Sequence, residues 1–263
     1  MVRALSTIKD AVTIRTGPTD SRRHALTQAQ QLYSLRRSIK RCGQAGHKCG
    51  GALCARCSGA RSGRFRRELY AAVKHQPGTL VSWTATVATT PSAGVRQQWA
   101  DLLAVIQATT RGGWLARQGI IGTARAVEVA RSADGWHVHA HHLAVFRNVL
   151  SAENFDTFAL TLRSRYLAEA DRLGIPASSY GQDIARTRSA HAWTHYLDKG
   201  GIHPDGNDTA SQLWTAVLAG DADALHLAHE LEAGAYRRRM WTTTGVCRPV
   251  PDFDALVAAG ALD

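Results

Sequence analysis

The chain has 263 residues and a mass of 28.5 kDa, which suits one large domain or a domain with an appended module. Apolar residues make up 44% and charged residues 20%, and this composition excludes disorder, collagen-like repeats and coiled coils. The formal net charge is +11, and no apolar run approaches the roughly 18 residues of a membrane-spanning helix. Because no apolar signal region follows Met1 either, we expect a soluble, cytoplasmic protein without a membrane partner.

The positive charge is concentrated near the start of the chain. Between Asp20 and Glu68 there are twelve basic residues and no acidic one, whereas residues 68–263 carry 17 bases and 19 acids. A field of this kind favours a polyanion as partner, so the sequence indicates a nucleic-acid-binding protein. The alternative is a basic face that is simply solvated.

Four of the five cysteines fall within sixteen residues, at Cys42, Cys49, Cys54 and Cys57. In a soluble chain, dense cysteines bind metal more often than they form disulfides. The Cys54-x-x-Cys57 pair is the spacing that presents two thiolates to one zinc ion, and zinc needs four ligands. The sequence therefore predicts a structural zinc module rather than idle thiols. His47 could replace either member of the looser first pair.

The elements that follow are predicted from periodicity. Residues 65–73 repeat apolar side chains every four positions and favour a helix that ends near Gln76-Pro77-Gly78, where we place a domain boundary. Residues 80–90 are β-branched and aromatic and predict a strand. A helix is expected from Val95 to Gly112-Gly113, because apolar residues lie on one face of this segment.

Two further strands are predicted at residues 124–130 and 136–146, joined by a turn whose Asp134-Gly135 pair favours a hairpin. Ser151 opens another helical pattern. Beyond it we expect a strand near 182–186, a helix that carries Tyr196, and helices over about 211–239. This order predicts an α+β fold with helices packed on one face of an antiparallel sheet.

The strongest chemical signal is the alternation of His137, His139 and His141 in GWHVHAHHLAVF. A strand sends alternate side chains to the same face, so these three imidazoles converge. Imidazole is a common metal ligand, and Glu128 in the neighbouring strand can add an oxygen. We expect a site for Mn²⁺ or Mg²⁺, with zinc or iron as alternatives, although one of the histidines could be structural. His142 should point to the opposite face.

These motifs resemble those of rolling-circle plasmid replication initiators in the HUH endonuclease superfamily. GWHVHAHHL is similar to the histidine-hydrophobe-histidine motif, and LVSWTATV is similar to the Thr-rich first motif. HAWTHYLDKG resembles the third motif, which maps the nucleophile onto Tyr196 and its partner onto Lys199. Glu128 falls where many members place a third metal ligand. The cysteine cluster and AGAYRRRMWTTTG also match, so the resemblance covers about residues 40 to 248.

The resemblance implies a palm-like HUH catalytic domain over 78–248, after a basic zinc-binding segment over 1–77 and before a tail over 249–263. It implies metal-dependent nicking of single-stranded or hairpin origin DNA, with a 5′-phosphotyrosine link and a free 3′-hydroxyl primer. A separate helicase is expected, because the chain has no GxxxxGK[ST] loop. A dimer is a further expectation.

One position departs from the family. Some relatives carry a glutamate four residues before the tyrosine, where it is thought to activate water for termination, and this chain has Ala192 there. His191, His195 or Asp198 could substitute for it. Tyr166, Tyr180 and Tyr236 compete with Tyr196 as nucleophile, of which Tyr166 fits a helical core and Tyr236 suits contact with DNA.

Backbone phosphates are expected to meet seven arginines, namely Arg61, Arg64, Arg66, Arg67, Arg237, Arg238 and Arg239. Three tryptophans could stack on bases or pack in the core, namely Trp83, Trp114 and Trp136.

Three other functions fit parts of the pattern. A relaxase or tyrosine transposase uses the same chemistry on another substrate. A metallohydrolase is a different class, because HVHAHH approaches an HxHxDH pattern but places His141 at the aspartate position. A non-enzymatic zinc DNA-binding regulator would leave the histidine strand without a purpose.

Overall fold

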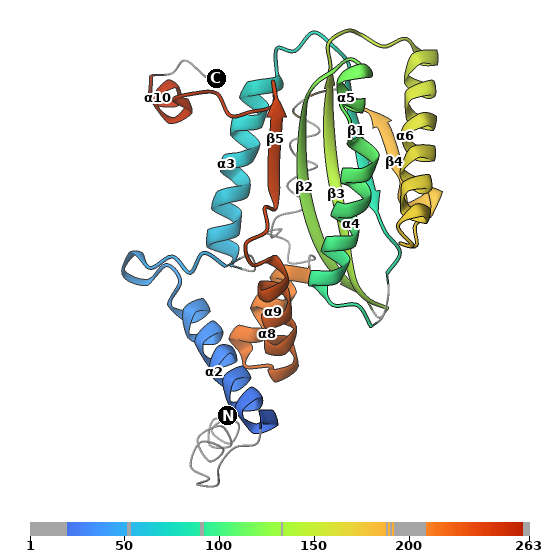
Figure 1. Cartoon of the computed structure of the whole chain (residues 1–263). Coiled ribbons are helices and arrows are strands. Elements are labelled where there is room, and N and C mark those ends of the chain that lie inside the picture. Colours follow the sequence, from blue (N-terminus) through green and yellow to red (C-terminus); the bar gives the residue numbers. More distant parts are fainter. Residues whose placement is uncertain are drawn as a thin grey trace.

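A five-stranded antiparallel sheet forms the centre of the protein (Figure 1), with strand order β4-β1-β3-β2-β5. The computed structural model describes residues 20–51, 54–89, 92–132, 134–187, 189, 191 and 209–259. The strands are β1 (Leu80–Thr86), β2 (Ile120–Ser132), β3 (Gly135–Phe146), β4 (Asp183–Arg186) and β5 (Trp241–Gly245). The predicted α+β class is confirmed.

Helices surround this sheet. They are α2 (Asp20–Arg41), α3 (Ala55–Val73), α4 (Val95–Thr110), α5 (Trp114–Arg117), α6 (Ala152–Arg172), α8 (Thr209–Ala219), α9 (Ala222–Ala235) and α10 (Phe253–Ala258). Short 3-10 turns occupy Gln44–Gly46 and Ser179–Gly181. None of the helices in the described ranges is long and apolar enough to cross a membrane.

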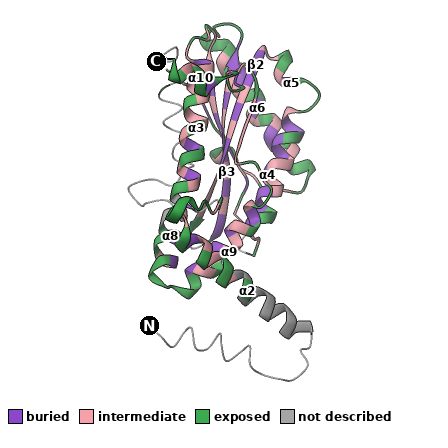
Figure 2. Ribbon diagram, turned by 90° about the vertical axis from the view of Figure 1, so that its left-hand side faces the viewer, coloured by how far each residue is buried: buried purple, intermediate pink, exposed green. Residues whose placement is uncertain are grey.

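One face of the sheet carries the main hydrophobic core. Alternate residues of β1 point into it. Trp83 from this strand contacts Tyr166 of α6, with ring centroids 5.6 Å apart, and Trp99 of α4 belongs to the same core. Figure 2 shows this arrangement as buried strands with helices that are exposed on their outer sides. The alternation follows from the two-residue period of a strand, which gives each face its own set of side chains.

The second face is covered by α3, so the expectation that helices pack on one face only is wrong. Leu69 and Val73 of this helix pack against Ala124 and Leu143 of the sheet in a smaller core. The large side chains of the helix thus pack over small residues of β2 such as Ala124 and Ala126. Since α3 lies before the expected boundary at residue 77, the segment over 1–77 contributes directly to the core of the sheet.

Several element boundaries differ from those expected. β1 ends at Thr86 rather than Thr90. α9 ends at Ala235, so Arg237, Arg238 and Arg239 lie in the connection after this helix rather than within it. Arg237 adopts a left-handed φ of 59°, which a helix cannot accommodate. α2 and β5 were not predicted.

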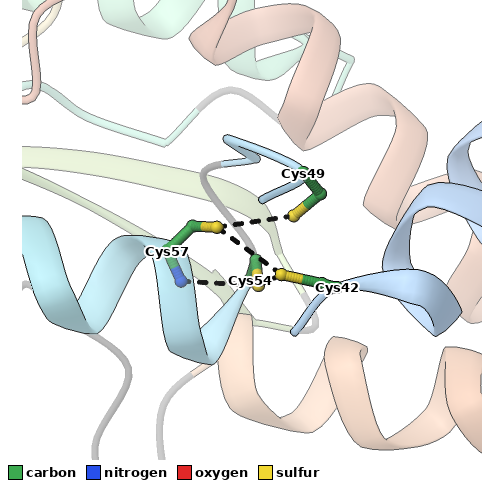
Figure 3. Close-up of side chains that lie close together, drawn as sticks. All are labelled: Cys42, Cys49, Cys54 and Cys57. Carbon is green, nitrogen blue, oxygen red and sulfur yellow. Dashed lines mark hydrogen bonds between the residues drawn. The ribbon is translucent and has the colours of Figure 1, made fainter. Parts of the chain in front are cut away.

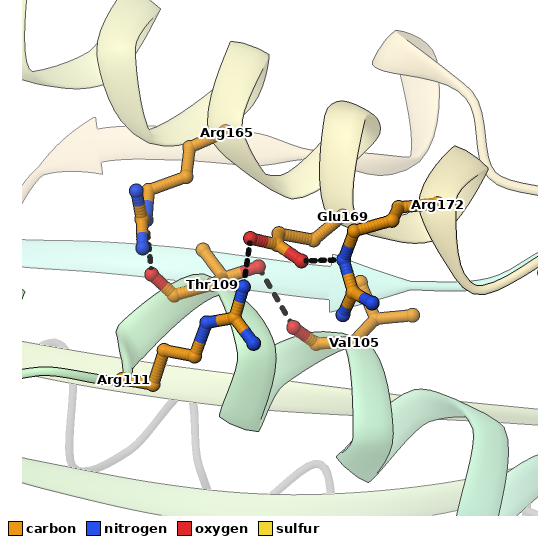
Figure 4. A network of polar contacts seen from close by, with 6 residues as sticks. All are labelled: Val105, Thr109, Arg111, Arg165, Glu169 and Arg172. Atoms are coloured by element: carbon orange, nitrogen blue, oxygen red, sulfur yellow. Dashed lines mark hydrogen bonds and ion pairs between the residues drawn. The ribbon is translucent and has the colours of Figure 1, made fainter.

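Helices α4 and α6 are also joined by a polar network (Figure 4). Glu169 of α6 accepts hydrogen bonds from Arg111 at 3.2 Å and from Arg172 at 2.7 Å. Arg165 donates to the carbonyl of Thr109, one of the free carbonyls at the end of α4. Solvent screens ion pairs at the surface, so they contribute little to stability, and the network orients the two helices more than it stabilises them.

Replacement of Leu102 by alanine should destabilise the protein by about 2–5 kcal/mol, because its side chain is fully buried in the main core. Urea unfolding followed by circular dichroism measures this change. The matched control is Leu160→Ala on α6, whose side chain is 60% exposed and which should change stability by less than about 0.5 kcal/mol. Equal effects of the two substitutions would contradict the packing described.

Candidate metal centres

Glu128, His139 and His141 come together on the α3 face of the sheet. In the β2–β3 pairing, Glu128 lies directly opposite His139, and His141 follows two residues along β3 on the same face. The Glu128 Oε2 atom is 2.8 Å from His139 Nε2 and 3.0 Å from His141 Nε2. One ligand atom from each of the three residues lies within 4.8 Å of the others. We call these three residues the triad.

The triad is partly shielded from solvent, with side-chain exposures of 22% for Glu128, 16% for His139 and 5% for His141. Burial alone would raise the pKa of Glu128, but hydrogen bonds and Coulombic attraction from the two imidazoles outweigh it and lower the pKa to about 2. The carboxylate is therefore ionised at any working pH. An anionic oxygen with two imidazole nitrogens is a donor set that suits a divalent transition metal such as Mn²⁺.

A threonine of β1 positions the His141 ring. Thr84 is paired with His141 across the β1–β3 ladder, and its hydroxyl lies 3.2 Å from His141 Nδ1. Metal-binding histidines commonly use their second nitrogen in this way. His139 Nδ1 is buried and has no hydrogen-bond partner among the residues that the structure describes. The contact of Thr84 with His141 was not predicted, although the Thr-rich segment that contains Thr84 was recognised as a motif.

The other two histidines of the motif are not part of the triad. His137 lies on the same face, but its nitrogens contact the hydroxyls of Thr89 at 3.0 Å and Thr86 at 3.4 Å. His142 points to the opposite face as expected, where its ring stacks on Trp83 with centroids 4.6 Å apart. Burial, and then the nearby charges of Arg125 and His141, lower its pKa to about 3. His142 is therefore uncharged, and its ring packs on the side of the sheet that carries the main core.

The predicted nucleophile Tyr196 and its partner Lys199 lie outside the described residues, together with Ala192, His195 and Asp198. His191 is described, and its ring contacts that of Tyr70 on α3 at 6.1 Å.

Of the competing tyrosines, Tyr166 is fully buried, and its hydroxyl donates to the Thr86 carbonyl at 3.0 Å. Its expected role in packing is therefore confirmed. Tyr180 and Tyr236 are 99% and 67% exposed.

The four clustered cysteines form a second candidate metal centre (Figure 3). Their sulfurs are separated by 3.2 Å (Cys42–Cys54), 3.6 Å (Cys42–Cys57) and 3.8 Å (Cys49–Cys57). A tetrahedron with zinc–sulfur bonds of about 2.3 Å has edges of about 3.8 Å, so the arrangement is close to that of a zinc site. His47 is not in this group. The four thiols can therefore hold a metal ion without it.

The start of α3 organises the cysteine cluster. Cys54 is the N-cap of this helix, and its sulfur accepts from the Cys57 backbone N–H at 3.5 Å. Hydrogen bonds from the Cys49 backbone and the Cys54 thiol lower the pKa of Cys42 to about 7, whereas burial raises those of Cys49 and Cys54. Metal binding would displace the remaining protons, because the thiolate is the ligand.

The predicted phosphate-contacting arginines lie on α3 and on the connection between α9 and β5. Arg61 donates to the carbonyls of Gly50 and Gly51 at 3.0 and 2.9 Å, and Arg64 pairs with Glu68 at 2.6 Å and with Asp254 at 3.2 Å. Arg67, Arg237 and Arg239 are exposed, whereas Arg66 and Arg238 are half-buried. Arg61 and Arg64 are thus already engaged within the protein.

The three tryptophans considered for base stacking belong to the core. Trp83, Trp114 and Trp136 are 5%, 6% and 2% exposed. Rings this buried cannot offer a face to a base, so the packing alternative holds for all three.

The isolated protein should carry one zinc ion per chain on its four-cysteine cluster, and Cys54→Ser should lose that ion because three thiolates and a hydroxyl bind zinc more weakly. Metal analysis by mass spectrometry after gel filtration measures the content. The matched control is Cys247→Ser, since Cys247 is buried and away from the cluster. Zinc retention in Cys54→Ser with loss in Cys247→Ser would reverse this assignment.

Comparisons with protein-family models, with curated proteins and with solved structures found no significant match to this chain. The function is therefore inferred from the chemistry of the two candidate metal centres and the surface around them.

Proposed function

We propose that this protein is a rolling-circle replication initiator of the HUH type, which nicks single-stranded origin DNA by transesterification to Tyr196. The observation that carries the proposal is the convergence of Glu128, His139 and His141 on one face of an antiparallel sheet. The strand that presents both histidines is the central strand, so the geometry of the triad is held by pairing on both sides.

Three protein ligands leave coordination positions for substrate oxygens. A divalent cation such as Mn²⁺ or Mg²⁺ at the triad would act as Lewis acid and template for the scissile phosphate. Glu128 supplies a permanent negative charge, since its pKa is lowered to about 2. Thr84 holds the His141 ring, so the direction of its Nε2 atom is set before any ligand arrives.

The proposed reaction exchanges one ester for another. The phenol oxygen of Tyr196 forms a bond to the scissile phosphorus, and the bond from phosphorus to the 3′ oxygen breaks. The phenol proton leaves the nucleophile, and the departing 3′ oxygen gains a proton, which yields a 3′-hydroxyl primer and a 5′-phosphotyrosine. No nucleotide cofactor is needed. Lys199 is proposed to favour the phenolate or neutralise the phosphate.

The length of chain between His191 and Tyr196 is compatible with a role of Tyr196 at the triad. His191 lines a cavity with Leu80 at the start of β1, and Thr84 at the triad lies four residues along that strand, or about 13 Å at the rise of a strand. Tyr196 is five residues beyond His191. Five extended residues span at most about 17 Å, which exceeds the distance of about 13 Å along β1.

The basic surface supports a DNA substrate. Arg61 of α3 lines one pocket with the exposed Arg237 and Arg239. Arg61 also donates to the carbonyls of Gly50 and Gly51, in the loop directly after Cys49. Phosphate contacts of this kind hold DNA without reading its sequence. The origin sequence would then be selected by other contacts, and duplex opening would need a separate helicase.

Incubation with Mn²⁺ and 3′-labelled single strands of random sequence should give a covalent adduct that survives denaturing electrophoresis, because the 3′ fragment stays attached through its 5′ phosphate. Tyr196→Phe should abolish the adduct. Sequencing of the captured strands would identify the site that is cut. An adduct that persists in Tyr196→Phe would refute the nucleophile. Hydrolysis of small esters without an adduct would favour a metallohydrolase, and DNA binding without cleavage a regulator.

The triad is tested separately from the zinc module, because chelators remove both metals. His139→Ala should lower the rate of adduct formation by at least about 100-fold, since it deletes a ligand. The exposed His75 provides a matched His75→Ala control that should react like the unaltered protein. Equal rates for both variants would argue against a catalytic triad.

Thr84→Val should weaken Mn²⁺ binding by about 10- to 100-fold, because it removes the hydroxyl that orients His141. Titration calorimetry on zinc-loaded protein gives the affinity, and Thr84→Ser should restore it. Ser82→Ala is the control on the same strand and face, since the Ser82 hydroxyl donates to the Ala185 carbonyl instead. Unchanged affinity in Thr84→Val would remove this residue from the site.

A further inference from the structure

A basic pocket of about 380 Å³ lies between the first turns of α3 and the connection from α9 to β5. Its lining includes four arginines, one tyrosine and one glutamate, namely Arg61, Arg237, Arg238, Arg239, Tyr236 and Glu232. We propose that this pocket binds one unpaired nucleotide of the DNA strand, with the base on Tyr236 and the adjoining phosphate on Arg239. The proposal rests on the proposed function for the identity of the strand.

The pocket is adjacent to the triad through the pairing of β2 with β5. Trp241, which lines the pocket, is paired with Ala126, two residues before Glu128. The backbone N–H of Val127, the residue next to Glu128, donates to the Met240 carbonyl at 2.8 Å. A DNA strand bound in the pocket would therefore lie beside β2, which supplies the carboxylate of the triad.

The charges in the pocket favour a phosphodiester. Four arginines face a single acidic side chain, Glu232, so the net field is positive. Arg61 is held by two carbonyls, and Arg238 is held by the Arg96 carbonyl at 3.1 Å. Arg239 is exposed and makes no hydrogen bond or ion pair with the part of the chain that the structure describes. Arg237 is exposed as well, but its guanidinium lies over the Tyr236 ring, so Arg239 is the arginine that is proposed to meet the phosphate.

Tyr236 provides the stacking surface. The residue is 67% exposed, so its ring is accessible to a base. The Arg237 guanidinium lies 5.2 Å from the ring centroid, a pairing that also adds positive charge beside a stacked base. The left-handed φ of 59° at Arg237 turns the chain directly after this tyrosine. Aromatic rings beside arginines are the usual platform for single-stranded nucleic acid.

The size of the pocket selects an unpaired nucleotide over a duplex. About 380 Å³ lies within the range of small-molecule sites, and a stacked platform needs a base whose face is free. Arg61 also ties the pocket to the cysteine cluster, since the carbonyls that it contacts belong to Gly50 and Gly51, directly after Cys49. The pocket wall thus depends on the same loop that carries a proposed zinc ligand.

The test measures binding without cleavage. Zinc-loaded full-length protein is titrated, with no Mn²⁺ added, into 3′-fluorescein-labelled dT12, and fluorescence anisotropy is recorded at several salt concentrations. Tyr236→Ala should weaken binding by about 5- to 100-fold, and Tyr236→Phe should not. Arg239→Ala should lower the slope of log affinity against log salt by about 0.7, and Arg239→Lys should retain it.

Two controls make the result specific. Arg117→Ala, on α5 and outside the pocket lining, should bind dT12 like the unaltered protein. A 12-base-pair duplex should bind Tyr236→Ala and the unaltered protein equally, because its bases are already stacked. Equal losses on duplex and single strand would overturn the nucleotide pocket.

The outcomes separate this proposal from the nicking activity. If an adduct forms with Mn²⁺ but Tyr236→Ala and Arg239→Ala bind dT12 normally, the pocket is wrong and the nicking proposal stands. If no adduct forms but both variants lose affinity for dT12, the pocket is supported as a single-strand site and the nicking proposal is wrong.

Discussion

The pairing of β2 with β3 is the constraint on which the candidate site depends. It places Glu128 directly opposite His139, and the two-residue period of β3 brings His141 to the same face. A slip of one residue would send both histidines into the aromatic core and bring His142 to the α3 face. The turn at Asp134-Gly135 opposes such a slip, since Gly135 adopts a φ of 118° that other residues rarely take.

One face of the sheet carries the main hydrophobic core, and the other carries the candidate metal site. One face buries tryptophans and other large apolar side chains under α4 and α6, which provides most of the hydrophobic stabilisation. The other face meets α3 through small residues such as Ala124 and Ala126 near one end. The triad lies further along this face, where its side chains keep 5–22% exposure. A partly exposed polar cluster is tolerated there because the main core lies on the far side.

Local signals in the sequence predicted much of the fold. The strands β2 and β3, their Asp-Gly turn, and the helix capped by Ser151 follow from short-range periodicity and capping chemistry. The triad and the four-cysteine cluster were predicted for the same reason, since alternation along a strand and a Cys-x-x-Cys turn are local geometries.

Features that depend on distant pairing were not predictable in this way. β5 is held by Ala126 and its neighbours more than one hundred residues earlier. Its tryptophan and threonines favour a strand, but the partner of that strand cannot be read locally. The burial of Trp83 and Trp136 also depends on which helices cover the sheet. The contacts that hold His137 outside the triad come from Thr86 at the end of β1 and from Thr89 in the segment after it.

The margins of the sheet have a consequence for self-association. The outermost strands, β4 and β5, have only four and five residues, and β5 ends at Gly245, where a side chain would collide with the carbonyl of Ile121. Short terminal strands of this kind offer little unpaired backbone to another copy of the chain. Continuous sheets shared between protomers are therefore disfavoured, and protomers that pair would meet through their helices and loops.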